Sequence, residues 1–167
     1  MPRVLVVEAE PVVRSVIQWM LTRGGFEVVH VGNCVQPDAS HDCALQCYSG
    51  VAPPDVVIAA VVNPRQCSGI EVAAKALCLW SGVKVLLISA TPADFWPADA
   101  RALLETLPVG SYSFLPKPFT SDALQPVVAA LAGGVRNSLD PITEIGLAAP
   151  NEIIRPARRP TSKSNVA

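Results

Sequence analysis

A small group of thiol and imidazole side chains is one place where residue type and spacing could support chemistry. His41, Cys43 and Cys47 form an H-x-C-x3-C pattern, and Cys34 lies upstream. Cys43 and Cys47 would share one face of a helix. Zinc sites usually contain C-x2-C pairs, which this cluster lacks. Cysteines that pack as small apolar side chains are therefore the favoured interpretation, and a metal site is the alternative.

The cysteines as a set give no sign of a disulfide framework. The chain has five of them, an odd number with irregular spacing, which favours reduced thiols in the cytosol. The apolar runs are shorter than the ~20 residues that span a bilayer, and the N-terminal run is too short for a signal peptide. We therefore expect a cytoplasmic protein. Cys67 follows a buried strand and is the thiol to test for reactivity.

Two apolar runs end where a site could be built. Residues 3–7 are predicted to be a strand followed by Glu8 and Glu10, and residues 55–60 a central strand buried on both faces. In parallel α/β sheets, sites form at the carboxyl ends of the strands. The second run ends in Ala59, Ala60 and two valines. This strand end therefore carries apolar side chains and has no carboxylate, hydroxyl or thiol that could take part in chemistry.

Strand and helix patterns alternate along the chain. Five strands are predicted, at residues 3–7, 26–31, 55–60, 83–89 and 112–115. Five helices are predicted, at residues 11–24, 38–50, 69–80, 98–107 and 121–132. Apolar residues recur with helical spacing in the first helix, at Val12, Val13, Val16, Ile17, Met20 and Leu21. The alternation predicts an α/β fold with a parallel sheet and helices on both faces.

Local signals place the ends of several elements. Ser68 and Glu71 predict a capping box. Pro126 falls inside the last helix, where we expect it to strain or kink the backbone. The domain is expected to span residues 1–132. Residues 133–167 contain several prolines and are expected to be a flexible tail.

Composition argues against two classes of partner. Only 16% of the residues are charged and the net charge is −1, which gives no electrostatic case for nucleic acid or an anionic membrane. The basic residues of the tail are Arg155, Arg158, Arg159 and Lys163. We interpret them as solvated charges rather than as a site for an acidic partner.

Four segments, in this order, resemble the receiver domain of bacterial two-component response regulators. They are VLVVEAEP (residues 4–11), DVVIAAVVNPRQCSGIEVA (55–73), VLLISA (85–90) and FLPKPF (114–119). The resemblance covers residues 1–132. It implies a CheY-like, flavodoxin-like doubly wound sheet in the order 2-1-3-4-5, with the site at the switch point between strands 1 and 3.

The resemblance also implies roles for individual positions. The acidic pair that follows the first strand in this family corresponds to Glu8 and Ala9, and Glu10 matches a third acid that is usually not a metal ligand. The family's phosphoacceptor aspartate lies four residues before a loop proline, here Pro64, so its position holds Ala60. Relative to the family, the acid at Glu8 has a longer side chain, the acid at Ala9 is lost, and the phosphoacceptor at Ala60 is absent.

Other family positions are retained. The hydroxyl after the fourth strand is Ser89, the lysine after the fifth is Lys117, and the aromatic switch position is Phe114. We expect Lys117 to pair with Glu8 and Ser89 to bond to adjacent backbone, because an unpaired buried charge is costly. The alternative is a vestigial or repurposed anion pocket.

The receiver chemistry should therefore be lost. Phosphoryl transfer needs an acceptor carboxylate and a magnesium ion held by oxygen ligands, and Ala9 and Ala60 remove these groups. We expect no magnesium site, no cofactor and no enzymatic activity. Glu10 and Asp55 are the substitute acceptors to consider. Glu10 sits at the start of a helix, where an acid is stabilising in any case, and Asp55 lies at the wrong end of its strand, so neither is favoured.

The sequence thus predicts a stand-alone degenerate receiver, a phosphorylation-independent interaction module in two-component signalling with no DNA-binding output domain. Its partner would be a histidine kinase, another regulator or a second copy of itself. The alternatives are a phosphorelay receiver with an unusual acceptor, and a flavodoxin-like ligand binder. The ligand binder would need a Gly-rich phosphate loop that EAEP does not provide.

Two surfaces could meet a partner. The first is the face formed by the helix at residues 98–107, the strand at 112–115 and the last helix, where receivers commonly dimerise or dock effectors. Residues that could contribute to it, for a partner or a homodimer, are Ala102, Leu103, Val127 and Ala130. Helix packing within the domain could claim the same side chains. The second is the loop containing Phe95 and Trp96. These two aromatics either cover the core or face a partner, because aromatic residues are enriched at interface hot spots.

Overall fold

The computed structural model describes residues 1–30, 52–62 and 68–133 of the 167-residue chain. Several sequence predictions lie outside these residues and remain predictions. They are the helix at 38–50, the cluster of His41, Cys43 and Cys47 with Cys34, the loop residue Cys67, and the tail beyond residue 133. In the described parts, no helix has the length and apolar character needed to cross a membrane.

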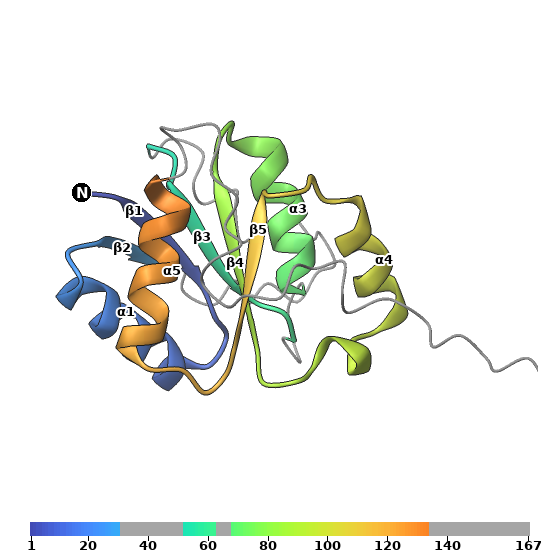
Figure 1. Cartoon of the computed structure of the whole chain (residues 1–167), viewed down its shortest axis with the longest axis horizontal. Helices are drawn as coiled ribbons and strands as arrows, with labels where there is room; N and C mark the ends of the chain where they lie inside the picture. The colour runs from blue at the N-terminus through green and yellow to red at the C-terminus, as the bar shows by residue number, and fades with distance from the viewer. Residues whose placement is uncertain (31–51, 63–67, 134–167) are drawn as a thin grey trace, which may run out of the picture.

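The core is a five-stranded parallel sheet in the order β2-β1-β3-β4-β5 (Figure 1). Its strands are β1 (Arg3–Val7), β2 (Glu27–His30), β3 (Val56–Ala60), β4 (Lys84–Ser89) and β5 (Tyr112–Pro116). The predicted α/β class and the strand order implied by the resemblance are both confirmed.

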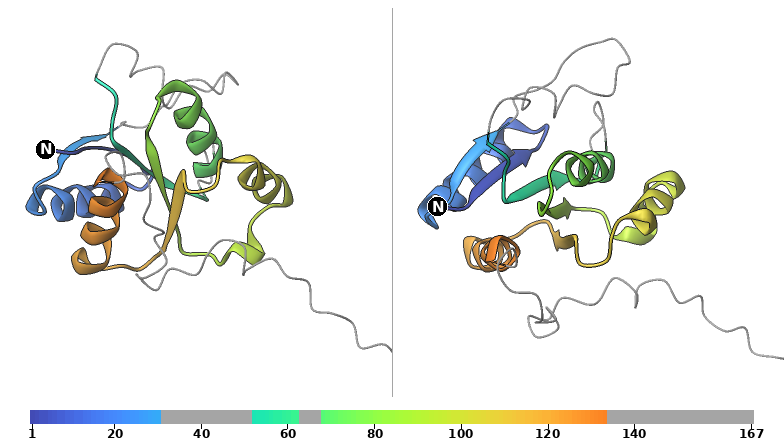
Figure 2. Two further views of the ribbon diagram at one scale, coloured as in Figure 1. Left: turned by 45° about the horizontal axis from the view of Figure 1, so that its top comes forward. Right: turned by 90° about the horizontal axis from the view of Figure 1, so that it is seen from above.

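Helices pack on both faces of the sheet, as predicted (Figure 2). The described helices are α1 (Pro11–Arg23), α3 (Gly69–Leu79), α4 (Ala98–Thr106), α5 (Ser121–Gly133) and a short 3-10 helix, η1 (Ala93–Phe95). Side chains of α1 and α5 share one apolar cluster with the sheet, and those of α3 and α4 share the other.

β3 explains why the sheet can be covered on both faces. Every residue of β3 is buried. Val56, Ile58 and Ala60 pack toward α1 and α5, whereas Val57 and Ala59 pack toward α3 and α4. A central strand of this kind needs apolar side chains on both sides, which is why it appears in the sequence as an uninterrupted apolar run.

Local signals account for the start of α3 and for both ends of α1. Ser68 and Glu71 form the predicted capping box: Ser68 Oγ accepts a bond from the Glu71 N–H at 3.2 Å, and the Ser68 N–H donates to Glu71 Oε2 at 2.8 Å. Pro11 opens α1, and the chain leaves that helix through Gly25, whose φ of 80° favours glycine. Pro126 does not interrupt α5. It is exposed, so the carbonyl left without its helical partner is free to bind water.

Candidate functional site

Four residues meet at the carboxyl edge of the sheet. Val7 pairs with Ala59 and Ala60 pairs with Ile88, so Glu8, the next residue after Val7, reaches the level of Ala60. Ser89 pairs with Pro116, and the Lys117 N–H donates to the Ser89 carbonyl at 2.8 Å. The register thus brings together Glu8, Ala60, Ser89 and Lys117, the positions that the resemblance implied.

An ion pair between a buried carboxylate and a partly exposed ammonium occupies this edge. Lys117 Nζ lies 2.6 Å from Glu8 Oε2, and the Glu8 side chain is only 4% exposed. Glu8 Oε1 accepts a further bond from the Glu10 N–H at 3.0 Å. Both carboxylate oxygens therefore have a partner within the chain, and the predicted Glu8–Lys117 pairing is present in the structure.

Ala60 itself brings no reactive group to the end of β3, and its surroundings in the described residues are apolar side chains and backbone. Ala60 is 2% exposed and belongs to the apolar cluster beneath α1 and α5. A Cβ on Gly69 would come within 2.4 Å of the Ala60 carbonyl oxygen, because α3 begins directly against the end of β3. The tip of β3 is thus packed by a methyl group on one side and by the backbone of α3 on the other.

The Ser89 hydroxyl forms hydrogen bonds with the backbone that follows β4. It donates to the Thr91 carbonyl at 3.0 Å and accepts from the Thr91 N–H at 3.0 Å. The prediction that Ser89 bonds to adjacent backbone is therefore confirmed. These two bonds form a compact turn at the start of the loop between β4 and α4.

Phe95 and Trp96 have opposite environments, so the interpretation that the aromatics cover the core holds for Trp96 and not for Phe95. Phe95 is 77% exposed, whereas Trp96 is 4% exposed. The Trp96 indole N–H donates to the Thr91 carbonyl at 2.8 Å, and its ring meets Phe114 edge-on with centroids 5.5 Å apart. Trp96 therefore connects the Ser89 turn to the aromatic on β5, a role that sequence reasoning missed.

The remaining acids are separate from this edge or exposed. The Asp55 carboxylate accepts a bond from the Arg3 N–H at 2.7 Å at the amino end of β3, the opposite edge of the sheet, as predicted. Glu10 is exposed and precedes α1 without a side-chain capping bond. Ala9 is partly buried. Within residues 1–30, 52–62 and 68–133, no three His, Cys, Asp or Glu side chains are grouped to hold a metal ion.

The structure divides the four residues considered for a partner face of α4, β5 and α5. Val127 is 7% exposed and packs in the core, so helix packing takes this side chain. Ala102 is exposed, and Leu103 and Ala130 are partly buried.

Tyr112 on β5 is the described residue with a shifted pKa. Burial raises its pKa above the ordinary value of 10.0, so its phenol stays neutral at physiological pH.

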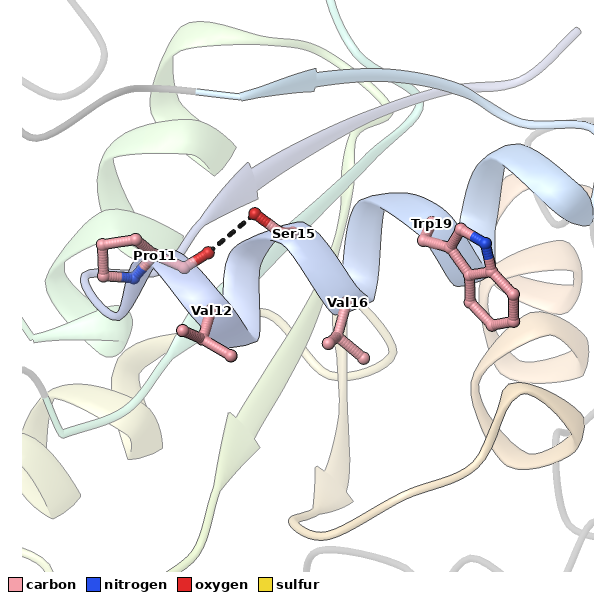
Figure 3. A pocket seen from close by; sticks show the side chains of 5 residues that line it. All are labelled: Pro11, Val12, Ser15, Val16 and Trp19. Carbon is pink, nitrogen blue, oxygen red and sulfur yellow. Dashed lines mark hydrogen bonds between the residues drawn. The ribbon is translucent and has the colours of Figure 1, made fainter.

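An apolar surface that the sequence did not reveal lies on α1. The spacing of apolar residues in α1 predicted one apolar face. The buried residues of the helix are Ile17 and Leu21. Val12 and Val16 are instead 68% and 44% exposed, and Trp19 is 57% exposed. Figure 3 shows them lining a shallow depression on the outer side of the helix. Apolar residues on both sides of a helix hide such a surface from a periodicity argument.

Several solved structures that this chain resembles are response regulators or receiver domains of signalling proteins. The chemotaxis protein CheY4 of Vibrio cholerae has a TM-score of 0.60 at 20% identity, covering 78% of this chain and 98% of that one. The receiver domain of a histidine kinase from Syntrophus aciditrophicus has a TM-score of 0.62 at 20% identity, with coverages of 89% and 99%. The response regulator TrrA of Thermotoga maritima has a TM-score of 0.58 at 25% identity, with coverages of 78% and 99%.

No family model matches the chain. The structural likenesses show the fold: this chain has the architecture of a CheY-like receiver domain.

Proposed function

We propose that this chain, which has the receiver fold, is a degenerate receiver of two-component signalling that acts in the cytoplasm as a phosphorylation-independent protein-interaction module. Its partners would be a histidine kinase, another regulator or a second copy of the chain. The observation that carries the proposal is Ala60, a buried methyl at the acceptor position, level with Glu8 at the end of β3.

The chemistry of phosphoryl transfer supports this proposal. The reaction needs an oxygen nucleophile in line with the donor phosphorus, and alanine has none. Asp55 cannot replace it, since its carboxylate lies at the far edge of the sheet beside the Arg3 N–H. The Glu10 side chain is exposed, and it is the Glu10 backbone N–H that contacts the Glu8 carboxylate.

The retained charges support the proposal in a second way. Magnesium in such a site would take carboxylate oxygens as ligands. Glu8 already accepts bonds from the Lys117 ammonium and the Glu10 N–H. A cation bound at Glu8 would lie beside the Lys117 ammonium, so two positive charges would share one carboxylate in a partly buried space. Loss of the magnesium site and absence of catalysis are parts of this proposal.

A receiver without a phosphoacceptor can change its conformation only in response to a binding partner. A partner shifts a conformational equilibrium only through its differential affinity for the two states. The elements that we expect to differ between the two states are the Ser89–Thr91 turn and the Trp96–Phe114 contact, which connect the end of β4 to β5. The module would thus respond to a partner rather than to phosphate.

The test is a binding measurement. Histidine kinases and receivers from the same genome are screened against the full chain, and the affinity for each partner found is compared before and after treatment with acetyl phosphate and magnesium. The proposal predicts a partner whose Kd is unchanged when only this chain is treated. A tenfold or greater change in Kd, equivalent to about 1.4 kcal/mol, would show that phosphorylation controls binding.

A further inference from the structure

The exposed stripe on α1 consists of Val12, Val16 and Trp19, and we call it the α1 face. The three residues follow one another at intervals of four and three, so their side chains line one side of the helix (Figure 3). Ile17 and Leu21 bury the opposite side in the core. The α1 face therefore contributes little to the domain's own packing and leaves apolar side chains in water.

The charged side chains of α1 itself are basic, and the exposed Glu10 directly precedes the helix. α1 contains Arg14 and Arg23 and no acidic residue. The Arg14 guanidinium donates to the Glu8 carbonyl at 2.9 Å. Arg23 lies over the Trp19 ring, 5.1 Å from its centroid, and forms no ion pair with a carboxylate in the parts of the chain that the structure describes. A ligand for this face should thus combine apolar side chains with negative charge.

We propose that residues 140–154 of the same chain dock on the α1 face. This segment, DPITEIGLAAPNEII, has its apolar side chains at Ile142, Ile145, Leu147, Ile153 and Ile154. Its charged residues are Asp140, Glu144 and Glu152, and it contains no lysine or arginine. Composition and charge are therefore complementary to the face.

The connection to α5 brings this segment to the right place. α5 ends at Gly133 and packs beside α1, where the Gln125 side-chain amide donates to the Met20 carbonyl at 2.7 Å. The linker of residues 134–139 can span about 20 Å when extended. That equals the length of α1, about 20 Å for its 13 residues. The segment can reach any part of the face.

The size of the face favours this occupant over a second copy of the chain. A stable interface between two molecules buries about 800 Å² on each, more than three partly exposed side chains supply. A tethered segment needs far less contact, because a short linker holds it at an effective concentration on the order of millimolar. Docking would cover the α1 face and restrict its access to other proteins.

The indole N–H resonances of the full chain test the proposal by NMR, with the Trp19 signal assigned from a Trp19→Phe variant. The full-length triple variant Ile142→Ser, Ile145→Ser and Leu147→Ser removes the apolar contacts of the segment. We expect the Trp19 resonance to shift in this variant at every protein concentration, while the resonance of buried Trp96 stays fixed. Thr161→Ala with Ser164→Ala, outside the segment, is the matched control and should leave both unchanged.

Two results would overturn the proposal. One is a Trp19 resonance that is identical in the wild type and in the triple variant. The other is a wild-type Trp19 resonance that moves on dilution, which would identify a second copy as the occupant. The measurement involves no phosphodonor or signalling partner, so its outcome is independent of the proposed function.

Discussion

The Lys117 ammonium lies 2.6 Å from the Glu8 carboxylate, although 109 positions separate the two residues in the chain. The contact joins the end of β1 to the end of β5 across the tip of β3, where Ala60 stands. The two polar groups neutralise each other at the edge of the sheet. The Glu8 carboxylate and the Lys117 ammonium therefore find their partners within the chain.

Removing one member of this pair should destabilise the fold. Lys117→Met leaves the Glu8 carboxylate buried without its cation, and we expect a loss of about 3 kcal/mol in the free energy of unfolding. Urea denaturation measures the change. The double variant Glu8→Gln with Lys117→Met should recover most of the loss, because no unpaired charge remains. A single variant as stable as the wild type would contradict the inferred importance of the pair.

Gly69 should tolerate no side chain. The Cβ of Gly69→Ala would meet the Ala60 carbonyl oxygen at 2.4 Å, so α3 or the end of β3 must shift. We expect a destabilisation of about 2 kcal/mol, in the range of overpacked sites. Gly133→Ala is the matched control, since a Cβ there has no neighbour within 4 Å and alanine favours the helix. Equal thermal midpoints for the two variants would contradict the close approach of α3 to β3.

Trp96 should matter more to stability than its neighbour Phe95. Trp96→Phe loses the indole hydrogen bond to the Thr91 carbonyl and part of the contact with Phe114, so we expect a cost of about 1–2 kcal/mol. Phe95→Ala, at a 77% exposed position, should change stability by less than about 0.5 kcal/mol. Chemical denaturation of both variants checks the contrast, and the reverse order would show that the loop is packed differently.

The fold could be predicted in detail because its signals are local. The buried run of β3, the capping box of Ser68 and Glu71, and the glycines after α1 each define an element by backbone or burial preferences that short segments carry. The order of the strands in the sheet could not be predicted from such local signals. It came from the resemblance, since strand patterns do not by themselves specify which strands are neighbours.

The site was predicted in part. The pairing of Lys117 with Glu8 followed from the cost of an unpaired buried charge, and the Ser89 turn from the tendency of serine to bond nearby backbone. The role of Trp96 and the exposure of Val12 and Val16 were missed. Each depends on which side of an element faces the core, and apolar residue types alone do not reveal this in a helix that is apolar on both sides.

The most direct test of the central claim is intact-mass spectrometry of the chain after incubation with acetyl phosphate and magnesium, beside a receiver that has its aspartate. The absence of a carboxylate at Ala60 predicts an unchanged mass for this chain while the control gains one phosphate. A single phosphate on this chain that alkali removes would contradict the claim, and mapping of Glu8 and Glu10 would then locate the acceptor.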